Sequence, residues 1–269
     1  MKRFYLSALY MLFGFTTFSF SQEINLGPRI TALGNTGVAL QDVWCLQSNQ
    51  AGVSNLKGFA ASICYRNNYL NQELSTQSAV AAYSTGRNIV GVSFQNYGFS
   101  AYSEQKIGLT YAKRFGPALT AALNVNLHQV KILQYGSAQA FSVEGGLQYR
   151  FDKKLTIGTH FSNPNKSGFN AEVNAMIPVV LEFGASYLFS DKLLLNSGFL
   201  KSLNREADFR CGLEYSFINV LALRGGLGMN PFRQFAGVGY HLKDLKFDAG
   251  ASTHPQLGIS PQIALSYEF

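Results

Sequence analysis

The residues in this sequence that could do chemistry are four histidines and three cysteines, and neither set has the spacing of a catalytic or metal site. His128, His160 and His241 fall in separate segments, so they would bind a metal only if those segments were neighbours in space. The chain has no Gly-x-Ser-x-Gly, His-Glu-x-x-His, Cys-x-x-Cys or Gly-x-x-x-x-Gly-Lys pattern. We therefore predict no enzymatic activity, no cofactor and no metal. A Ser–His or Asp–His pair assembled only in the fold stays open.

The cysteines are Cys45, Cys64 and Cys211. Three thiols cannot all pair within one chain, so we interpret them as small apolar side chains. A Cys45–Cys64 disulfide in an oxidising compartment is the alternative.

Composition separates this chain from ordinary soluble proteins. Only 14% of its residues are charged, against about 25% in soluble domains, while 47% are hydrophobic. Yet no run of about 18 apolar residues follows residue 20, which argues against membrane-spanning helices. The positive charges are scattered rather than clustered, so no nucleic-acid binding is expected.

Apolar and polar residues alternate at period two in about fourteen segments, which is typical of a transmembrane β-barrel. Tight turns such as Gly116-Pro117 and Asp152-Lys153 follow the even-numbered segments, and the other connections, such as Tyr97 to Glu104, are expected to be longer. We predict an all-β, antiparallel transmembrane barrel of about 14 strands with both termini in the periplasm. The predicted strands are 58–66, 75–84, 87–96, 105–115, 118–129, 138–151, 154–162, 178–190, 192–202, 206–217, 219–228, 232–242, 244–252 and 257–269.

The last strand has a distinctive end. Ile263, Leu265, Tyr267 and Phe269 share one face, and the chain stops on the aromatic Phe269. Tyr267 and Phe269 resemble the carboxy-terminal signal that the barrel-assembly machinery reads on outer-membrane proteins. A buried last strand of a soluble β-protein is the alternative.

The same alternation places charges of both signs on the inner face of the barrel, because an Arg facing lipid near the midplane would cost about 2–4 kcal/mol. They could line a selective pore, or they could pair in a network that holds a plug. The predicted lumenal network is Glu144, Arg150, Glu182, Arg210, Glu214 and Arg224, together with Lys246, Asp248 and Glu268.

The amino terminus divides into two parts. Lys2 and Arg3 precede an apolar run, and small residues before Gln22 predict a signal peptide over residues 1–21, with an uncleaved anchor as the alternative. Residues 22–56 do not alternate and are rich in small residues, so they precede the barrel, which we assign to residues 57–269.

Residues 22–56 resemble the start of the PorV/PorQ proteins, which are similar to the FadL-type channels. The matching positions are Arg29, Ala32, Leu33, Gly34, Gly37, Val38, Ala39, Asp42, Asn49, Ala51 and Gly52. Gln50 stands where the family has Pro, and a second acidic residue is absent. The resemblance implies that this segment folds inside the barrel as a hatch, with Arg29, Gly34, Gly37, Asp42 and Asn49 as hatch residues. An ordinary periplasmic extension is the alternative.

Two functions follow from the resemblance, both at the outer membrane. In the first, the protein serves type IX secretion by binding secretion-system components or secreted cargo. In the second, it is a FadL-like channel for hydrophobic small molecules. The polar loops 67–71 and 163–168 favour the first. The expected contacts are outer-membrane lipid and the assembly machinery.

Docking of the hatch would depend on its charges. We expect Arg29 and Asp42 to pair with Glu144, Glu182, Arg210 or Arg224 on the wall, which would keep conduction low.

Overall fold

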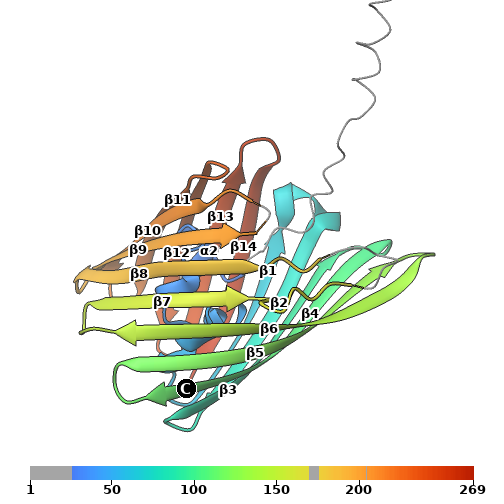
Figure 1. Cartoon of the computed structure of the whole chain (residues 1–269). Helices are drawn as coiled ribbons and strands as arrows, with labels where there is room; N and C mark the ends of the chain where they lie inside the picture. The colour runs from blue at the N-terminus through green and yellow to red at the C-terminus, as the bar shows by residue number, and fades with distance from the viewer. Residues whose placement is uncertain (1–25, 170–175, 204) are drawn as a thin grey trace, which may run out of the picture.

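The computed structural model describes residues 26–169, 176–203 and 205–269, and within them the chain forms a closed barrel of 14 antiparallel strands (Figure 1). The predicted fold class is confirmed. The predicted signal peptide lies outside the described residues. The strands are β1 (Phe59–Asn67), β2 (Ser75–Ser84), β3 (Asn88–Gly98), β4 (Tyr102–Phe115), β5 (Leu119–Ile132), β6 (Gly136–Arg150), β7 (Leu155–Ser162), β8 (Val180–Ser190), β9 (Leu193–Ser202), β10 (Asp208–Ile218), β11 (Leu221–Gly228), β12 (Arg233–Leu242), β13 (Leu245–His254) and β14 (Gly258–Glu268).

The barrel closes where β1 pairs with β14, from Ala60 opposite Glu268 to Arg66 opposite Gln262. Each strand pairs with its neighbours in sequence, and the described pairings are continuous except for register shifts at the ends of β8 and β10. Every backbone polar group in the wall can therefore be satisfied, which a lipid environment requires.

Connection length alternates less strongly than predicted. The turns after even-numbered strands are two to four residues long, as expected. However, the connection expected from Tyr97 to Glu104 contains only residues 99–101, because β3 and β4 continue pairing up to Gly98 opposite Ser103. At this position the strands themselves, rather than a long loop, extend the wall.

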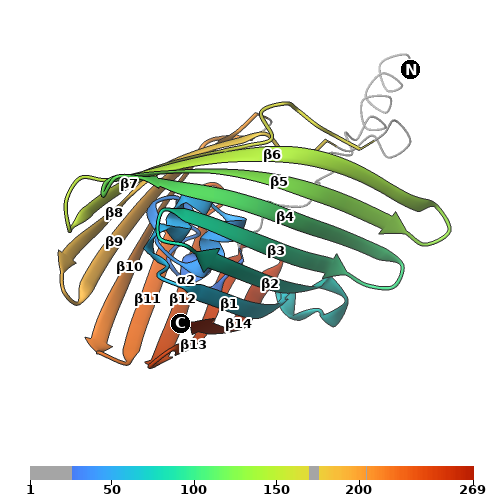
Figure 2. The same ribbon diagram turned by 90° about the horizontal axis from the view of Figure 1, so that it is seen from below.

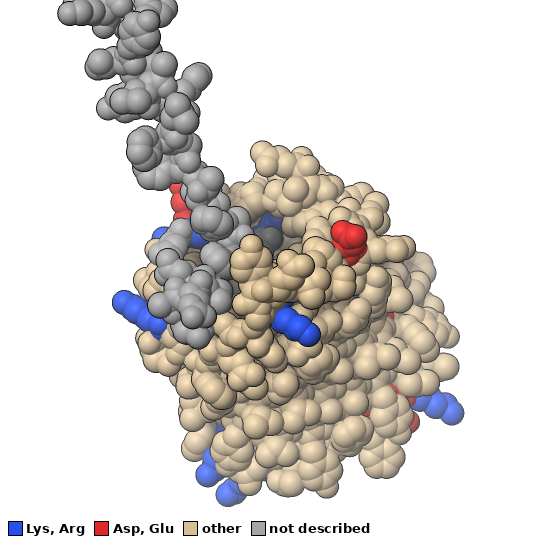
Figure 3. All heavy atoms as spheres, turned by 90° about the vertical axis from the view of Figure 1, so that its right-hand side faces the viewer, with Lys and Arg blue, Asp and Glu red and all other residues tan. Residues whose placement is uncertain are grey.

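The two faces of the wall differ in the way a membrane barrel requires. Apolar side chains such as Ile63, Leu123 and Ile263 are about 60% exposed on the outside, whereas polar side chains such as Asn126 and Glu144 are buried inside. Figure 3 views the end that carries connections 99–101 and 133–135 and shows only scattered charges on an uncharged surface. This apolar belt over a polar interior is that of an outer-membrane barrel.

The segment before β1 lies inside the barrel (Figure 2). It contains helix α2 (Pro28–Ala32) and the 3₁₀ turns η1 (Gly37–Ala39), η2 (Val43–Gln47) and η3 (Gln50–Asn55). Two further 3₁₀ turns, η4 (Asn68–Leu70) and η5 (Gln72–Leu74), lie between β1 and β2. None of the helices in the described ranges is long and apolar enough to cross a membrane.

Candidate functional site

The candidate site is the lumen and the segment that fills it, residues 26–56, which we call the inner segment. Its apolar side chains, including Trp44 and Leu33, are almost wholly buried. They share a core with small side chains of the wall, including Ala60 and Ala112.

The inner segment packs directly on the backbone of the wall. Eight consecutive strands, β6 to β13, each place one lumenal glycine against it, and a Cβ added there would lie 3.3 Å or less from an atom of the inner segment. A side chain at these positions would need the room that the inner segment occupies. We call this set the glycine belt: Gly146, Gly158, Gly184, Gly198, Gly212, Gly226, Gly237 and Gly250.

Gly34 and Gly37 serve different purposes in the inner segment. Gly34 has a φ of 76° and sits against the carbonyl oxygens of Cys211 and Leu227, so it needs both a left-handed backbone and close approach to the wall. Gly37 is crowded by the Ser48 side chain, so packing inside the segment is what requires a glycine there.

Arg29 anchors the inner segment to the wall. Its Nε and Nη2 donate to the two carboxylate oxygens of Glu214 at 2.8 Å each, and its Nη1 donates to Asp42 at 3.2 Å. Burial alone would lower the pKa of Arg29, but the carboxylates of Glu214 and Asp42 outweigh burial and raise it. Glu214 also accepts from Arg224, which in turn donates to Asp248. The carboxylates predicted to pair with Arg29, Glu144 and Glu182, are therefore wrong, because Arg29 meets Glu214, and Asp42 pairs with Arg29 rather than with Arg210 or Arg224.

Asn49 and Gln148 hold the backbone of the inner segment. Asn49 donates to the carbonyl oxygens of Val38 (2.6 Å) and Leu147 (3.1 Å), which ties η3 to η1 and to β6. Gln148 on β6 donates to the carbonyl oxygens of Val38 and Leu40. Because buried carbonyl groups need partners, these amides replace the bonds that a regular helix would supply.

Glu144 is the centre of a second polar cluster. It accepts from Gln50 of the inner segment at 2.5 Å, from Lys106 on β4 at 2.9 Å and from Asn126 on β5 at 2.8 Å. His160 lies 3.5 Å away on β7. Every element around this buried carboxylate offers it a donor or a positive charge, which is how a buried charge is tolerated.

The remaining predicted network residues are not joined to the Arg29 anchor by ion pairs. Arg210 pairs with Asp208 at 2.7 Å on its own strand and donates to the Asn35 carbonyl oxygen at 3.4 Å. Glu182 lies opposite His160 in the β7–β8 pairing, and the ion pairs found among residues 26–169, 176–203 and 205–269 do not include it. Arg150 is the last residue of β6, next to the β6–β7 turn.

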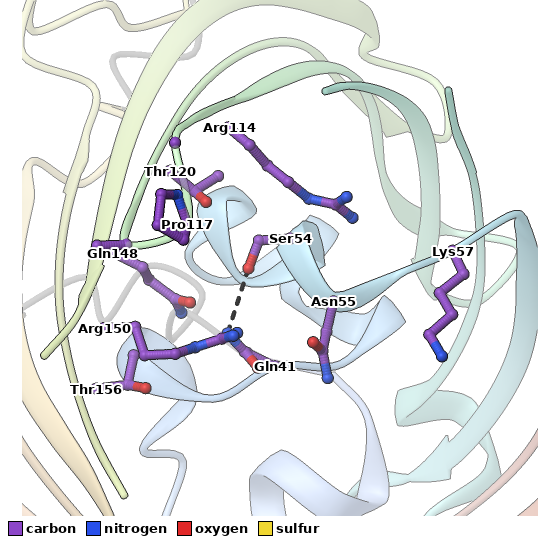
Figure 4. Close-up of a pocket in the computed structure, with 12 residues that line it drawn as sticks. Gln41, Ser54, Asn55, Lys57, Arg114, Pro117, Thr120, Gln148, Arg150 and Thr156 are labelled. Carbon is purple, nitrogen blue, oxygen red and sulfur yellow. Dashed lines mark hydrogen bonds between the residues drawn. The ribbon is translucent and has the colours of Figure 1, made fainter. Parts of the chain in front are cut away.

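Two cavities lie on either side of the inner segment. One, of about 350 Å³, is at the end with the longer connections and is lined by Val180, Leu200 and Arg210 among others. The other, of about 330 Å³, is at the short-turn end and is lined by Gln41 and Ser54 of the inner segment together with β4, β5 and β6 (Figure 4). The inner segment thus lies between these two cavities.

The three cysteines are free, and the alternative Cys45–Cys64 disulfide is not formed. Cys45 is fully buried in the inner segment, its Sγ 3.3 Å from the Leu40 carbonyl oxygen, and burial raises the pKa of its thiol. Cys211 is exposed on the outer face. In the described ranges, no group of three or more His, Cys, Asp or Glu side chains could hold a metal ion.

Several solved structures are similar to this one in fold. The Ralstonia pickettii toluene transporter TbuX superposes with a TM-score of 0.69 at 15% identity, over 91% of this chain and 98% of that one. The monoaromatic hydrocarbon channel CymD gives 0.70 at 12%, over 92% and 98%. This chain has the fold of the FadL-type hydrocarbon channels. A Pseudomonas aeruginosa FadL homologue gives 0.60 at 12%, over 88% and 96%. No protein-family model and no curated protein matches the sequence, so the PorV/PorQ resemblance finds no support here.

Sequence reasoning missed the glycine belt, although its signal was present. Gly212 and Gly226 fall at lumenal positions of the alternation, between the charges of Glu214, Arg210 and Arg224. A lumenal glycine at the same height in strand after strand indicates that something packs against the wall there.

Proposed function

We propose that this protein is an outer-membrane channel for small hydrophobic molecules, with the inner segment as its hatch. The observation that carries the proposal is the likeness of fold to proteins described as toluene transporters and monoaromatic hydrocarbon channels, which extends over more than 90% of both chains. This favours the channel over the role in type IX secretion that the polar loops suggested.

The contacts of the inner segment support a movable hatch. Its polar contacts with the wall are all non-covalent: the fork to Glu214, the bond to Glu144, and further amide and guanidinium bonds to backbone carbonyl groups, such as those of Asn49 and Gln148. No disulfide joins it to the wall in the described part of the chain. Such contacts can break and form again without covalent change.

The cavity at the end with the longer connections supports uptake from outside. Pro178, Val180, Leu200 and Pro231 give it an apolar part, and the rest of its lining is polar or charged. One of the charged residues, Arg210, donates to the Asn35 carbonyl oxygen of the inner segment. A small hydrophobic molecule there would be in place to pass inward when the hatch moves.

A disulfide lock tests both parts of the proposal. A Cβ at Gly198 would lie 3.7 Å from the Thr36 Cβ, within the range of about 3.5–4.5 Å that disulfides use. The variant Thr36→Cys/Gly198→Cys is expressed in a Gram-negative host without its own hydrocarbon channel, and the initial rate of radiolabelled toluene uptake is measured before and after treatment with dithiothreitol.

Uptake is expected to exceed that of the empty host only when the lock is reduced, while the two single-cysteine variants transport in both states. If the unlocked protein and the empty host take up toluene at the same rate, the channel function is wrong. Equal uptake in the locked and reduced states would instead show that transport does not need the hatch to move.

A further inference from the structure

We propose that the cavity at the short-turn end of the lumen binds the carboxylate of a small organic acid through Arg150, with Arg114 and Lys57 adding positive charge. The cavity lies beside the turn at Gly116 and Pro117, between the wall and residues Gln41 and Ser54 of the inner segment. It has a volume of about 330 Å³.

The charge of this cavity is one-sided. Lys57, Arg114 and Arg150 line it, and no Asp or Glu does. Elsewhere in the described lumen most cations have a carboxylate within 4.0 Å, namely Arg29, Lys106, Arg210, Arg224, Arg233 and Lys246. Arg114 and Arg150 are half-buried and Lys57 is exposed, and a group of cations without a counter-charge favours an anion from outside the chain.

Arg150 has its donors available. Its side chain makes no hydrogen bond or ion pair with the residues that the structure describes, and it extends across the cavity toward Gln41 and Ser54 (Figure 4). Gln41 and Ser54 bond each other at 3.3 Å. A planar guanidinium held over a cavity in this way can form the two parallel bonds that a carboxylate accepts.

Arg114 is only partly engaged. It donates to the carbonyl oxygens of Gly86 (2.5 Å) and Leu56 (2.6 Å), which positions the end of the inner segment, while its Nε is buried without a partner. That Nε has almost no accessible surface for a ligand to reach, so Arg114 adds positive charge to the cavity rather than a hydrogen bond through this atom.

The size of the cavity indicates more than a bare ion. A water molecule takes about 30 Å³ of liquid volume, so a cavity of about 330 Å³ has room for an aromatic ring as well as its carboxylate. The hydroxyl groups of Thr120 and Thr156 also line it and can donate to the same anion. If the protein is a channel as proposed above, this cavity would be where a transported molecule leaves the lumen. Binding of a carboxylate in the cavity does not depend on that function.

The full mature protein in a neutral maltoside detergent provides the test. Fluorine NMR of 4-fluorobenzoate measures binding, and 4-fluorotoluene serves as the uncharged counterpart of the same shape. Arg150→Gln removes one charge without breaking any bond in the structure, and Lys192→Gln removes one charge from the exposed β8–β9 turn at the same end of the barrel. A second arm repeats the measurement in nanodiscs with and without phosphatidylglycerol, since a lipid phosphate offers the same anionic oxygens.

Saturable binding of 4-fluorobenzoate is expected, about tenfold weaker in Arg150→Gln, unchanged in Lys192→Gln and not displaced by 4-fluorotoluene. Equal binding in the wild type and Arg150→Gln, or displacement by 4-fluorotoluene, overturns the proposal. Loss of binding only in nanodiscs with phosphatidylglycerol overturns the organic acid in favour of a lipid headgroup. A protein that binds 4-fluorobenzoate here but fails the toluene-uptake experiment retains this site and loses the channel function.

Discussion

Replacing Arg29 by Met should release the inner segment from the wall while leaving the barrel intact. The substitution removes the two 2.8 Å bonds to Glu214 and keeps a long side chain of similar reach. Removing one partner of a buried ion pair costs about 3–5 kcal/mol when the other is left alone. Here Glu214 keeps Arg224, so we expect about 2 kcal/mol, or roughly a 30-fold shift toward the undocked segment.

The buried Cys45 thiol can report this shift. The reporter protein carries Cys64→Ala and Cys211→Ser, so that Cys45 is its one remaining cysteine. Because Cys45 is buried, maleimide reaches it only when the inner segment opens, and burial also raises the pKa of its thiol, which slows reaction in the closed state. Labelling of Arg29→Met at neutral pH should be about 30-fold faster than that of the parent. Arg29→Lys, which keeps the charge but not the fork, should fall between the two.

Two controls separate release from misfolding. Lys154→Met, in the exposed β6–β7 turn, removes one charge from the surface and should label at the parental rate. Heat-dependent mobility in electrophoresis should show a folded barrel in every variant. If Arg29→Met with a folded barrel labels within twofold of the parent, the ion pair to Glu214 does not hold the segment and the reasoning is refuted.

The remaining predictions concern the glycine belt, the inner segment and the end of the chain. Gly212→Leu should displace the inner segment and raise single-channel conductance in planar bilayers, whereas Gly225→Leu, whose Cβ would point to open space on the outer face of the next strand, should leave conductance unchanged; equal effects would contradict the belt. Deleting residues 22–56 should turn a quiet protein into one with large, steady conductance, and large conductance in the intact protein would mean that the segment closes nothing. Deleting Phe269, which is 80% exposed, should lower the amount of assembled barrel in the outer membrane, and unchanged abundance would show that the assembly machinery does not need it.

The strands of the wall could be predicted from sequence because apolar residues that face lipid alternate with polar residues that face the lumen. The largest boundary shift is three residues, at Tyr102 and Ile132, where β4 and β5 are longer than predicted and the added residues mix polar and apolar side chains. Past the belt the alternation fades, while backbone pairing such as Tyr102 opposite Ile132 continues. The alternation therefore predicts the part of a strand that faces lipid, and it does not predict how far the strand continues beyond the membrane.

The interior could be predicted only in part, because alternation gives the face of a residue and not its neighbours across the lumen. Glu144 and Glu214 are both lumenal, but only the path of the inner segment decides that Arg29 meets Glu214 and Gln50 meets Glu144. That path depends on where the glycine belt leaves room, which is a property of the closed barrel. No single strand carries that information.

The charges of the wall and of the inner segment are arranged so that most of them keep a partner if the inner segment moves away from the wall. Each wall carboxylate that holds the inner segment has a second cation on the wall, Arg224 for Glu214 and Lys106 for Glu144. Arg29 likewise keeps Asp42 within its own segment. Breaking the contact between the segment and the wall therefore leaves each of these carboxylates beside a cation, although Glu214 shares Arg224 with Asp248, and this lowers the cost of several kcal/mol that an orphaned buried charge imposes. The inner segment is neutral on its own, with Arg29 beside Asp42, whereas Glu214 and Asp248 share the single guanidinium of Arg224 once Arg29 leaves. The negative charge left on the wall favours the return of Arg29, so the same ion pair can set the docked state and form again after the segment moves.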